Sequence, residues 1–154
     1  MKKTLAFLSA AVLSLSLTAA SSTPAGFTDD LDAAIAASKK SGKTVYAVFS
    51  GSDWCYWCKV IEQGYLSKKD FVAEAKQHLE LVFIDTPRDK SVLSEKARAN
   101  NPGLVKKYGI RGFPTVMFIK TDGTGVRASR PGKDMSPKDY AKQLAKEAKA
   151  LKTK

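Results

Sequence analysis

Two cysteines, Cys55 and Cys58, are the only ones in the 154-residue chain. They follow a short apolar run, residues 45–49, that is typical of a buried strand, and a helix is expected to begin at about Cys55. Residues i and i+3 share one face of a helical turn, and a Cα separation of roughly 5–6 Å there fits a disulfide. A bridge across so short a loop gains little chain entropy. The pair is therefore poorly placed to stabilise a fold and well placed for thiol–disulfide exchange.

The position of the pair at a helix start should make the two thiols unequal. The first turn of a helix presents unpaired N–H groups and the positive end of the helix dipole, and both stabilise a thiolate. Cys55 is therefore expected to be the attacking thiol. Cys58 lies one turn further inside, and we expect it to be more buried and to resolve the mixed disulfide.

The rest of the chain alternates helix-like and strand-like patterns. The expected order is helix, strand, helix, helix, strand, helix, strand, strand, helix. The expected strands cover residues 45–49, 81–84, 115–119 and 126–129. Strands alternate with helices early and a hairpin closes the sheet late, so the sequence predicts an α/β fold with a central mixed β-sheet flanked by helices.

Several polar residues mark where the helices should begin and end. Thr28 is expected to cap the first helix, and Ser67 with Asp70 resembles a capping box. Residues 100–103, Asn-Asn-Pro-Gly, are expected to interrupt the helix that follows the second strand. Pro137 is expected at the first position of the last helix.

A second segment, residues 101–115, contains Gly-Ile-Arg-Gly-Phe-Pro-Thr directly before the third predicted strand. Together with the Trp-Cys-Tyr-Trp-Cys motif at residues 54–58, it closely resembles thioredoxin, and the resemblance covers residues 28–151. It implies a thioredoxin-like fold and a protein thiol–disulfide oxidoreductase. By resemblance, Pro114 would be a cis-proline facing the cysteines, and Phe113 would be free to hydrogen-bond an extended substrate backbone.

The chain departs from thioredoxin at three places. Tyr56 and Trp57 replace Gly-Pro between the cysteines, so the redox potential does not carry over. Phe49 replaces a buried aspartate, and Asp53 is nearer but expected to be solvated. With no carboxylate evident at position 49, the proton of Cys58 must pass to water, to another group or to none. We therefore expect Cys58 to lose its proton slowly and release of the mixed disulfide to accelerate with pH. No clear strand precedes the first helix, and the Gly-Ser-Asp-Trp-Cys sequence looks more like exported thioredoxin-like proteins.

Aromatic residues gather around both segments and suggest a surface for extended peptides. Trp54, Tyr56, Trp57 and Phe113, with Pro114, are the candidate substrate-binding residues. The same surface supports an alternative function, a peptide-binding or chaperone-like module that uses its disulfide little. A binder would keep its affinity when both cysteines are serine, whereas an enzyme would lose turnover.

The N-terminus has the pattern of an export signal. Lys2 and Lys3 precede an uncharged, mostly apolar run, and small residues follow at 18–20. The run is short for a membrane anchor and contains serines. We therefore expect a signal peptide over 1–20, a linker over 21–27, the thioredoxin-like domain over 28–151 and a tail over 152–154. The protein would be exported, either periplasmic or secreted, with no stable membrane insertion after cleavage.

Composition narrows the partners further. The net charge of +11 comes in part from lysines on one face of the last helix, which is typical of a solvated surface, and nucleic acid is not expected. His78 is the only histidine, and Lys59 stands where haem attachment would need another, so neither a metal nor a cofactor is expected. We expect a monomer with protein thiol or disulfide clients and a separate redox partner. Oxidation, reduction and isomerisation stay open, isomerisation being the least favoured.

Overall fold

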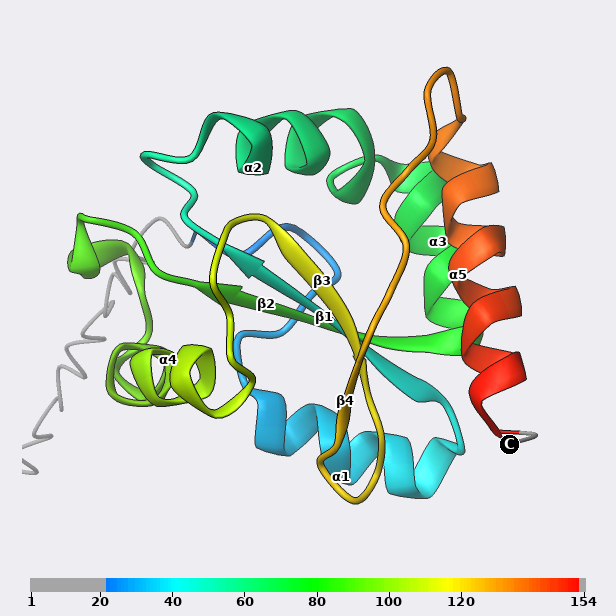
Figure 1. The fold of residues 1–154 in the computed structure, drawn as a ribbon, viewed down its shortest axis with the longest axis horizontal. Helices are drawn as coiled ribbons and strands as arrows, with labels where there is room; N and C mark the ends of the chain where they lie inside the picture. Colours follow the sequence, from blue (N-terminus) through cyan, green and yellow to red (C-terminus); the bar gives the residue numbers. More distant parts are fainter. Residues whose placement is uncertain (1–21, 153–154) are drawn as a thin grey trace, which may run out of the picture.

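The computed structural model describes residues 22–152, and its centre is a four-stranded sheet in the order β2-β1-β3-β4 (Figure 1). The strands are β1 (Thr44–Ser50), β2 (Leu79–Asp85), β3 (Thr115–Ile119) and β4 (Gly125–Arg127). β1 and β2 are parallel, whereas β3 is antiparallel to both β1 and β4. The predicted mixed sheet is thereby confirmed.

Helices cover both faces of the sheet (Figure 1). They are α1 (Leu31–Ser41), α2 (Tyr56–Ile61), α3 (Lys69–His78), α4 (Glu95–Lys107) and α5 (Pro137–Lys152), with a π-helical extension of α2 over Glu62–Leu66 and a 3-10 turn over Lys90–Val92. Side chains of α2, α3 and α5 share one hydrophobic cluster with Tyr46 and Val48 of β1. Side chains of α1 and α4 pack with the alternate residues Val45, Ala47 and Phe49. All seven residues of β1 are buried, which explains its continuous apolar sequence.

A buried pair of tyrosines ties the sheet to the last helix. The hydroxyl groups of Tyr46 and Tyr140 lie 2.9 Å apart, and the Tyr140 hydroxyl donates to the carbonyl oxygen of Ser129 at 2.9 Å. Burial raises the pKa of both phenols, so both stay neutral. The start of the loop between β4 and α5 is thus attached to the core through a hydrogen-bonded chain.

The N-terminal boundary differs from the sequence prediction. Asp30, not Thr28, caps α1, and its carboxylate accepts from the N–H of Ala33 at 3.0 Å. Thr28 instead forms a parallel bridge with Val82 on the outer side of β2. The preceding Phe27 packs into the core, so part of the segment expected to be a linker is docked on the domain. Pairing with β2 gives the backbone N–H and carbonyl of Thr28 hydrogen-bond partners. A position as the helix cap would not have supplied these partners.

Two further helix predictions were wrong. Ser67 does not form a capping box, because its N–H ends the π-helical segment by donating to the carbonyl of Glu62, and Lys68 precedes α3 without a side-chain cap. α4 also continues through Pro102 without the expected interruption. Its neighbour Asn101 is buried and donates to the carbonyl of Asp85 at 2.7 Å. That contact with β2 helps to offset the hydrogen bond that the proline removes.

The predicted signal peptide, residues 1–20, and the end of the predicted tail lie outside the described residues. Between residues 22 and 152, no helix is both long enough and apolar enough to cross a membrane.

Phe27 should anchor the N-terminal segment to the domain. Its ring lies 6.4 Å from that of Phe71 and 6.3 Å from that of Phe83. Replacing a fully buried phenylalanine with alanine costs about 3–5 kcal/mol. Because Phe27 is only partly buried, Phe27→Ala should lower the free energy of unfolding by about 2 kcal/mol. Urea unfolding measures this change, with exposed Ala25→Ser as the control, and an unchanged midpoint for Phe27→Ala would contradict the anchor.

Candidate active site

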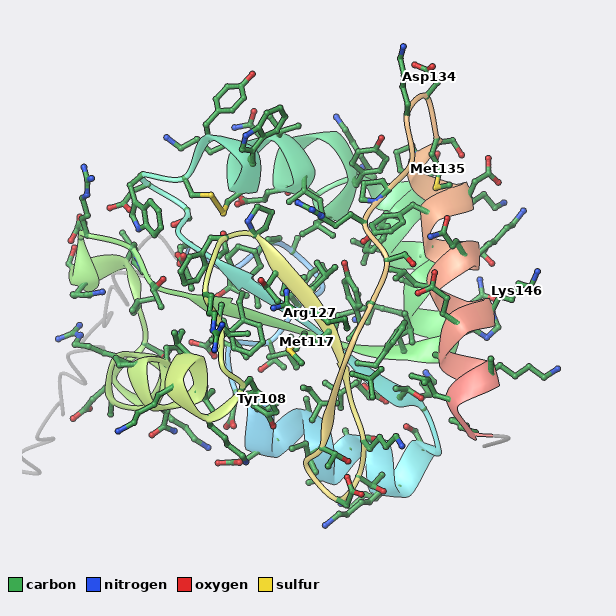
Figure 2. All side chains as sticks on the ribbon, viewed as in Figure 1. Tyr108, Met117, Arg127, Asp134, Met135 and Lys146 are labelled. Atoms are coloured by element: carbon green, nitrogen blue, oxygen red, sulfur yellow. A yellow bond between two sulfur atoms is a disulfide. The ribbon has the colours of Figure 1, made fainter. Side chains whose placement is uncertain are left out.

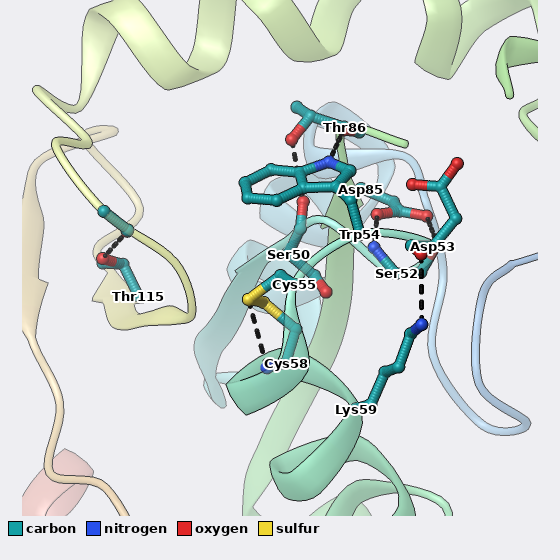
Figure 3. Close-up of a disulfide and its surroundings, with 11 residues drawn as sticks. Ser50, Ser52, Asp53, Trp54, Cys55, Cys58, Lys59, Asp85, Thr86 and Thr115 are labelled. Carbon is teal, nitrogen blue, oxygen red and sulfur yellow. Dashed lines mark hydrogen bonds between the residues drawn. A yellow bond between two sulfur atoms is a disulfide. The ribbon is translucent and has the colours of Figure 1, made fainter. Parts of the chain in front are cut away.

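The disulfide between Cys55 and Cys58 lies at the N-terminal end of α2, directly after the loop that leaves β1 (Figure 3). Their Cα atoms are 5.2 Å apart. Cys55 is the N-cap residue, and its Sγ accepts a hydrogen bond from the N–H of Cys58 at 3.2 Å. Cys55 keeps 7% of its surface exposed and Cys58 none. Cys55 is therefore the more exposed member of the pair, and Cys58 is fully buried.

Trp54 is fixed by a hydrogen bond and by a contact with another ring, although its side chain stays partly exposed to solvent. Its Nε1–H donates to the carbonyl oxygen of Thr86 at 2.9 Å (Figure 3). Its ring stands edge-on to that of Phe113, with the centroids 5.5 Å apart. The indole lies so close over Gly51 that a Cβ there would be 2.3 Å from Trp54 Cε2. Glycine is therefore required at position 51, because a larger residue would displace the indole beside the cysteines.

The remaining candidate substrate-binding residues fall into two groups. Tyr56 and Trp57, with 69% and 65% of their surfaces exposed, stand at the start of α2 with their ring centroids 5.1 Å apart. The Phe113–Pro114 peptide bond is cis, as the thioredoxin resemblance implies. Trp57 and Pro114 line one groove. The structure thus brings the two sequence segments together on one surface.

Positions 49 and 53, which the sequence analysis considered for proton transfer, are both unsuited to accept a proton from Cys58. Phe49 is fully buried against Tyr108, with no carboxylate at that position. Asp53 is exposed, but its carboxylate accepts from the N–H groups of Arg88 and Asp89, both at 2.9 Å. These hydrogen bonds lower the pKa of Asp53, first that from Asp89 and then that from Arg88. Asp53 therefore holds the loop after β2 and is a weak base.

Two other carboxylates, Glu62 and Asp85, were missed from the sequence, and the charge of Asp85 acts on Glu62. Glu62 follows Cys58 by four residues, on the same side of the helix, and its N–H donates to the Cys58 carbonyl. Asp85 ends β2, is buried, and accepts from the N–H of Ser52 at 2.9 Å (Figure 3). Burial, and then the charge of Asp85, raises the pKa of Glu62. Glu62 is a stronger base than Asp53, because the pKa of Glu62 is raised and that of Asp53 is lowered.

The i+4 spacing from Cys58 could have indicated Glu62 from sequence alone. Asp85 could have been found only through the parallel pairing of β1 with β2, which sets Asp85 opposite Ser50. Within residues 22–152, no group of three or more His, Cys, Asp or Glu side chains is arranged to hold a metal ion.

Comparisons with known proteins identify relatives of the whole domain. A family model described as "Thioredoxin-like domain" matches residues 31–148. The chain is 35% identical over 115 residues to "Disulfide bond reductase DsbH" of Chlamydia pneumoniae, covering 75% of this chain and 66% of that protein. It is 30% identical over 101 residues to "Thiol:disulfide interchange protein DsbD 2" of Pseudomonas aeruginosa, covering 66% of this chain and 16% of that protein. The alignments thus span less than two thirds of each relative.

Solved structures agree with these relatives. A structure titled "DsbH Oxidoreductase" superposes with a TM-score of 0.68 and 27% identity, covering 95% of this chain and 96% of that one. A disulphide isomerase from Xylella fastidiosa Temecula1 gives a TM-score of 0.53 and 26% identity, covering 76% and 87%. With its paired Cys55 and Cys58, the chain belongs to the thioredoxin-like family and is a homologue of disulfide oxidoreductases.

Proposed function

We propose that the protein reduces disulfides of exported proteins through Cys55 and Cys58. The observation that carries this proposal is the inequality of the pair, with Cys55 at a helix N-terminus keeping 7% of its surface exposed and Cys58 keeping none. Reduction, rather than oxidation, is favoured by the name of the Chlamydia relative. In this proposal the client binds to a surface around the cysteine pair, formed by Trp54, Tyr56, Trp57, Phe113 and Pro114.

The reaction has two exchange steps. The Cys55 thiolate attacks one sulfur of a client disulfide, which breaks that S–S bond and releases the first client thiol. The thiol of Cys58 then loses its proton and attacks Cys55 Sγ, which releases the second client thiol. Two electrons pass to the client, and Cys55 and Cys58 end as the disulfide seen in the structure. A separate dithiol protein must return two electrons to the pair before the next cycle.

Glu62 is the group best placed to take the proton of Cys58 during the second step. It is half-buried and one helical turn from Cys58. A thiol without solvent around it needs such a base, because burial disfavours the thiolate. Of the acceptors left open by the sequence, namely water, another group or none, the proposal selects another group, Glu62.

The peptide-binding alternative draws on the exposure of Tyr56 and Trp57. A variant with both cysteines changed to serine separates the two functions. Loss of disulfide reduction together with weak client binding supports the enzyme, and undiminished protection of clients from aggregation by this variant would support the binder.

Single cysteine variants test the roles of the thiols. Cys58→Ser should accumulate mixed disulfides with clients, because the accessible Cys55 can attack but nothing resolves the product. Cys55→Ser should trap few or none, since Cys58 is buried. Non-reducing gels of both variants after exposure to oxidised clients make the comparison. Equal trapping by the two variants would overturn the assignment.

Export is tested at the N-terminus of the mature protein. The leader pattern predicts that the chain isolated from its cells begins shortly after Ala19 or Ala20. N-terminal sequencing of the soluble protein measures this directly. Intact Met1 on soluble cytoplasmic protein would refute the proposed compartment.

Glu62→Gln should slow resolution of the mixed disulfide. General bases typically contribute ~10²–10⁴-fold, and hydroxide can replace part of this effect, so we expect about tenfold or more at pH 7. Above the raised pKa of Glu62 the wild type should be nearly independent of pH, whereas the variant should accelerate as pH rises. The measurement is single-turnover release of a preformed Cys55 mixed disulfide from pH 6 to 9.

Asp53→Asn is the matched control for this experiment, since it removes a carboxylate that is hydrogen-bonded to the 88–89 loop. Its resolution rate should stay within twofold of the wild type (roughly 0.4 kcal/mol). Equal slowing by the two variants would contradict a specific role for Glu62.

A further inference from the structure

A groove of about 300 Å³ lies beside the disulfide, between α2 and the loop that joins β4 to α5. Trp57 and Val60 of α2 form one apolar wall, and Pro114 and Pro131 contribute apolar surface from the other elements. Trp57 and Val60 are 65% and 41% exposed, and together they give the groove an exposed apolar wall. The groove is therefore suited to an apolar side chain of a client.

The rim of this groove is positively charged. Arg130 and Lys133 line it and are exposed, and none of its lining residues is acidic. The ion pairs found among residues 22–152 join Lys96 to Asp30 and Lys142 to Asp139, so neither rim cation is paired with a carboxylate. Asp134 follows Lys133 in sequence, but it stands at the tip of the loop and does not line the groove (Figure 2).

The positive charge continues on the other side of the cis-proline. A second hollow, of about 200 Å³, shares Pro114 and Arg130 with the groove and is also lined by Arg127. Arg127 donates to Thr115 Oγ1 at 3.0 Å, which fixes its guanidinium beside the start of β3. A peptide that crosses Pro114 therefore meets arginine on both sides of its path.

We infer that this groove selects client segments in which a large apolar residue and an aspartate or glutamate lie within a few residues of the target cysteine. The apolar side chain would pack against Trp57 and Val60, and the carboxylate would pair with Arg130 or Lys133. Arginine favours carboxylates because its planar group can donate two parallel hydrogen bonds. The inference rests on the proposed function and adds the class of client that the site attacks fastest.

Charge at the rim should act mainly on the rate of encounter. Complementary charges steer association, and the effect falls with ionic strength because salt screens exposed charges. An exposed charge pair contributes up to about fivefold in equilibrium terms. Two rim cations therefore predict a preference of about 5- to 20-fold for an acidic peptide over a basic one at low salt.

The test uses the reduced, mature protein and two synthetic peptides that differ at one position. Each peptide carries one cysteine as a mixed disulfide with thionitrobenzoate and one phenylalanine two residues away. The residue between the cysteine and the phenylalanine is aspartate in one peptide and lysine in the other. Release of thionitrobenzoate gives the second-order rate of attack by Cys55. The aspartate peptide should react about 5- to 20-fold faster at low salt, and less than about twofold faster at 0.5 M salt.

Charge reversal separates the groove from the net charge of the protein. The variant Arg130→Glu with Lys133→Glu should abolish or invert the preference. The matched control, Lys146→Glu with Lys149→Glu, makes the same change in net charge on α5, beside His78 and away from the groove (Figure 2). It should keep at least half of the preference. A third variant, Trp57→Ala, should reduce the advantage of phenylalanine over serine in the aspartate peptide.

The outcomes distinguish a failure of the client selectivity from a failure of the proposed disulfide reduction. Equal rates for the two peptides in the wild type, or equal loss of preference in the two double variants, would overturn the selectivity and leave the proposed reduction intact. Failure to react with either peptide would instead refute the proposed function.

Discussion

Burial of β1 on both faces is the constraint on which the rest of the molecule depends. Its side chains alternate between the cluster under α2, α3 and α5 and the cluster under α1 and α4. Its final carbonyl, on Ser50, accepts from both the N–H and the hydroxyl of Thr86, which fixes the ends of β1 and β2 together. The loop that carries Trp54 and Cys55 leaves from this fixed point. The disulfide is therefore positioned by the most buried strand of the protein.

The sequence was sufficient for elements whose pattern is local. The apolar run at 45–49, the Cys-x-x-Cys spacing and the proline at the start of α5 each predicted a structure that is present. Predictions failed where a distant contact decided the outcome. Thr28 bonds with β2, and α4 passes through Pro102 while Asn101 bonds to β2, so tertiary contacts overrode local capping and helix-breaking signals. Asp85 was missed for the same reason, because only the pairing of β1 with β2 places it opposite Ser50, whereas Glu62 was within reach of a local spacing argument.

The surroundings of the disulfide are electrically polarised. On one side Asp85 is buried and its charge acts on the half-buried Glu62. The groove is lined by Arg130 and Lys133, and the adjoining hollow by Arg127. Proton transfer requires a base near the shielded thiol, whereas client capture requires attraction at the open surface. In the functions proposed above, these two requirements fall on different elements: the carboxylates are on the extension of α2 and on β2, and the cations are on β4 and the loop after it.

The hydrogen-bonded tyrosines connect the groove to the core of the protein. Tyr46 in β1 contacts Tyr140 in α5, and Tyr140 holds the carbonyl of Ser129, the residue directly before Arg130. One wall of the groove is thus attached to the centre of the sheet through hydrogen bonds. A defect deep in the core would loosen that wall while leaving the cysteines intact. A genetic screen for altered client range would therefore recover Tyr46 and Tyr140, two residues buried in the protein, alongside residues of the surface.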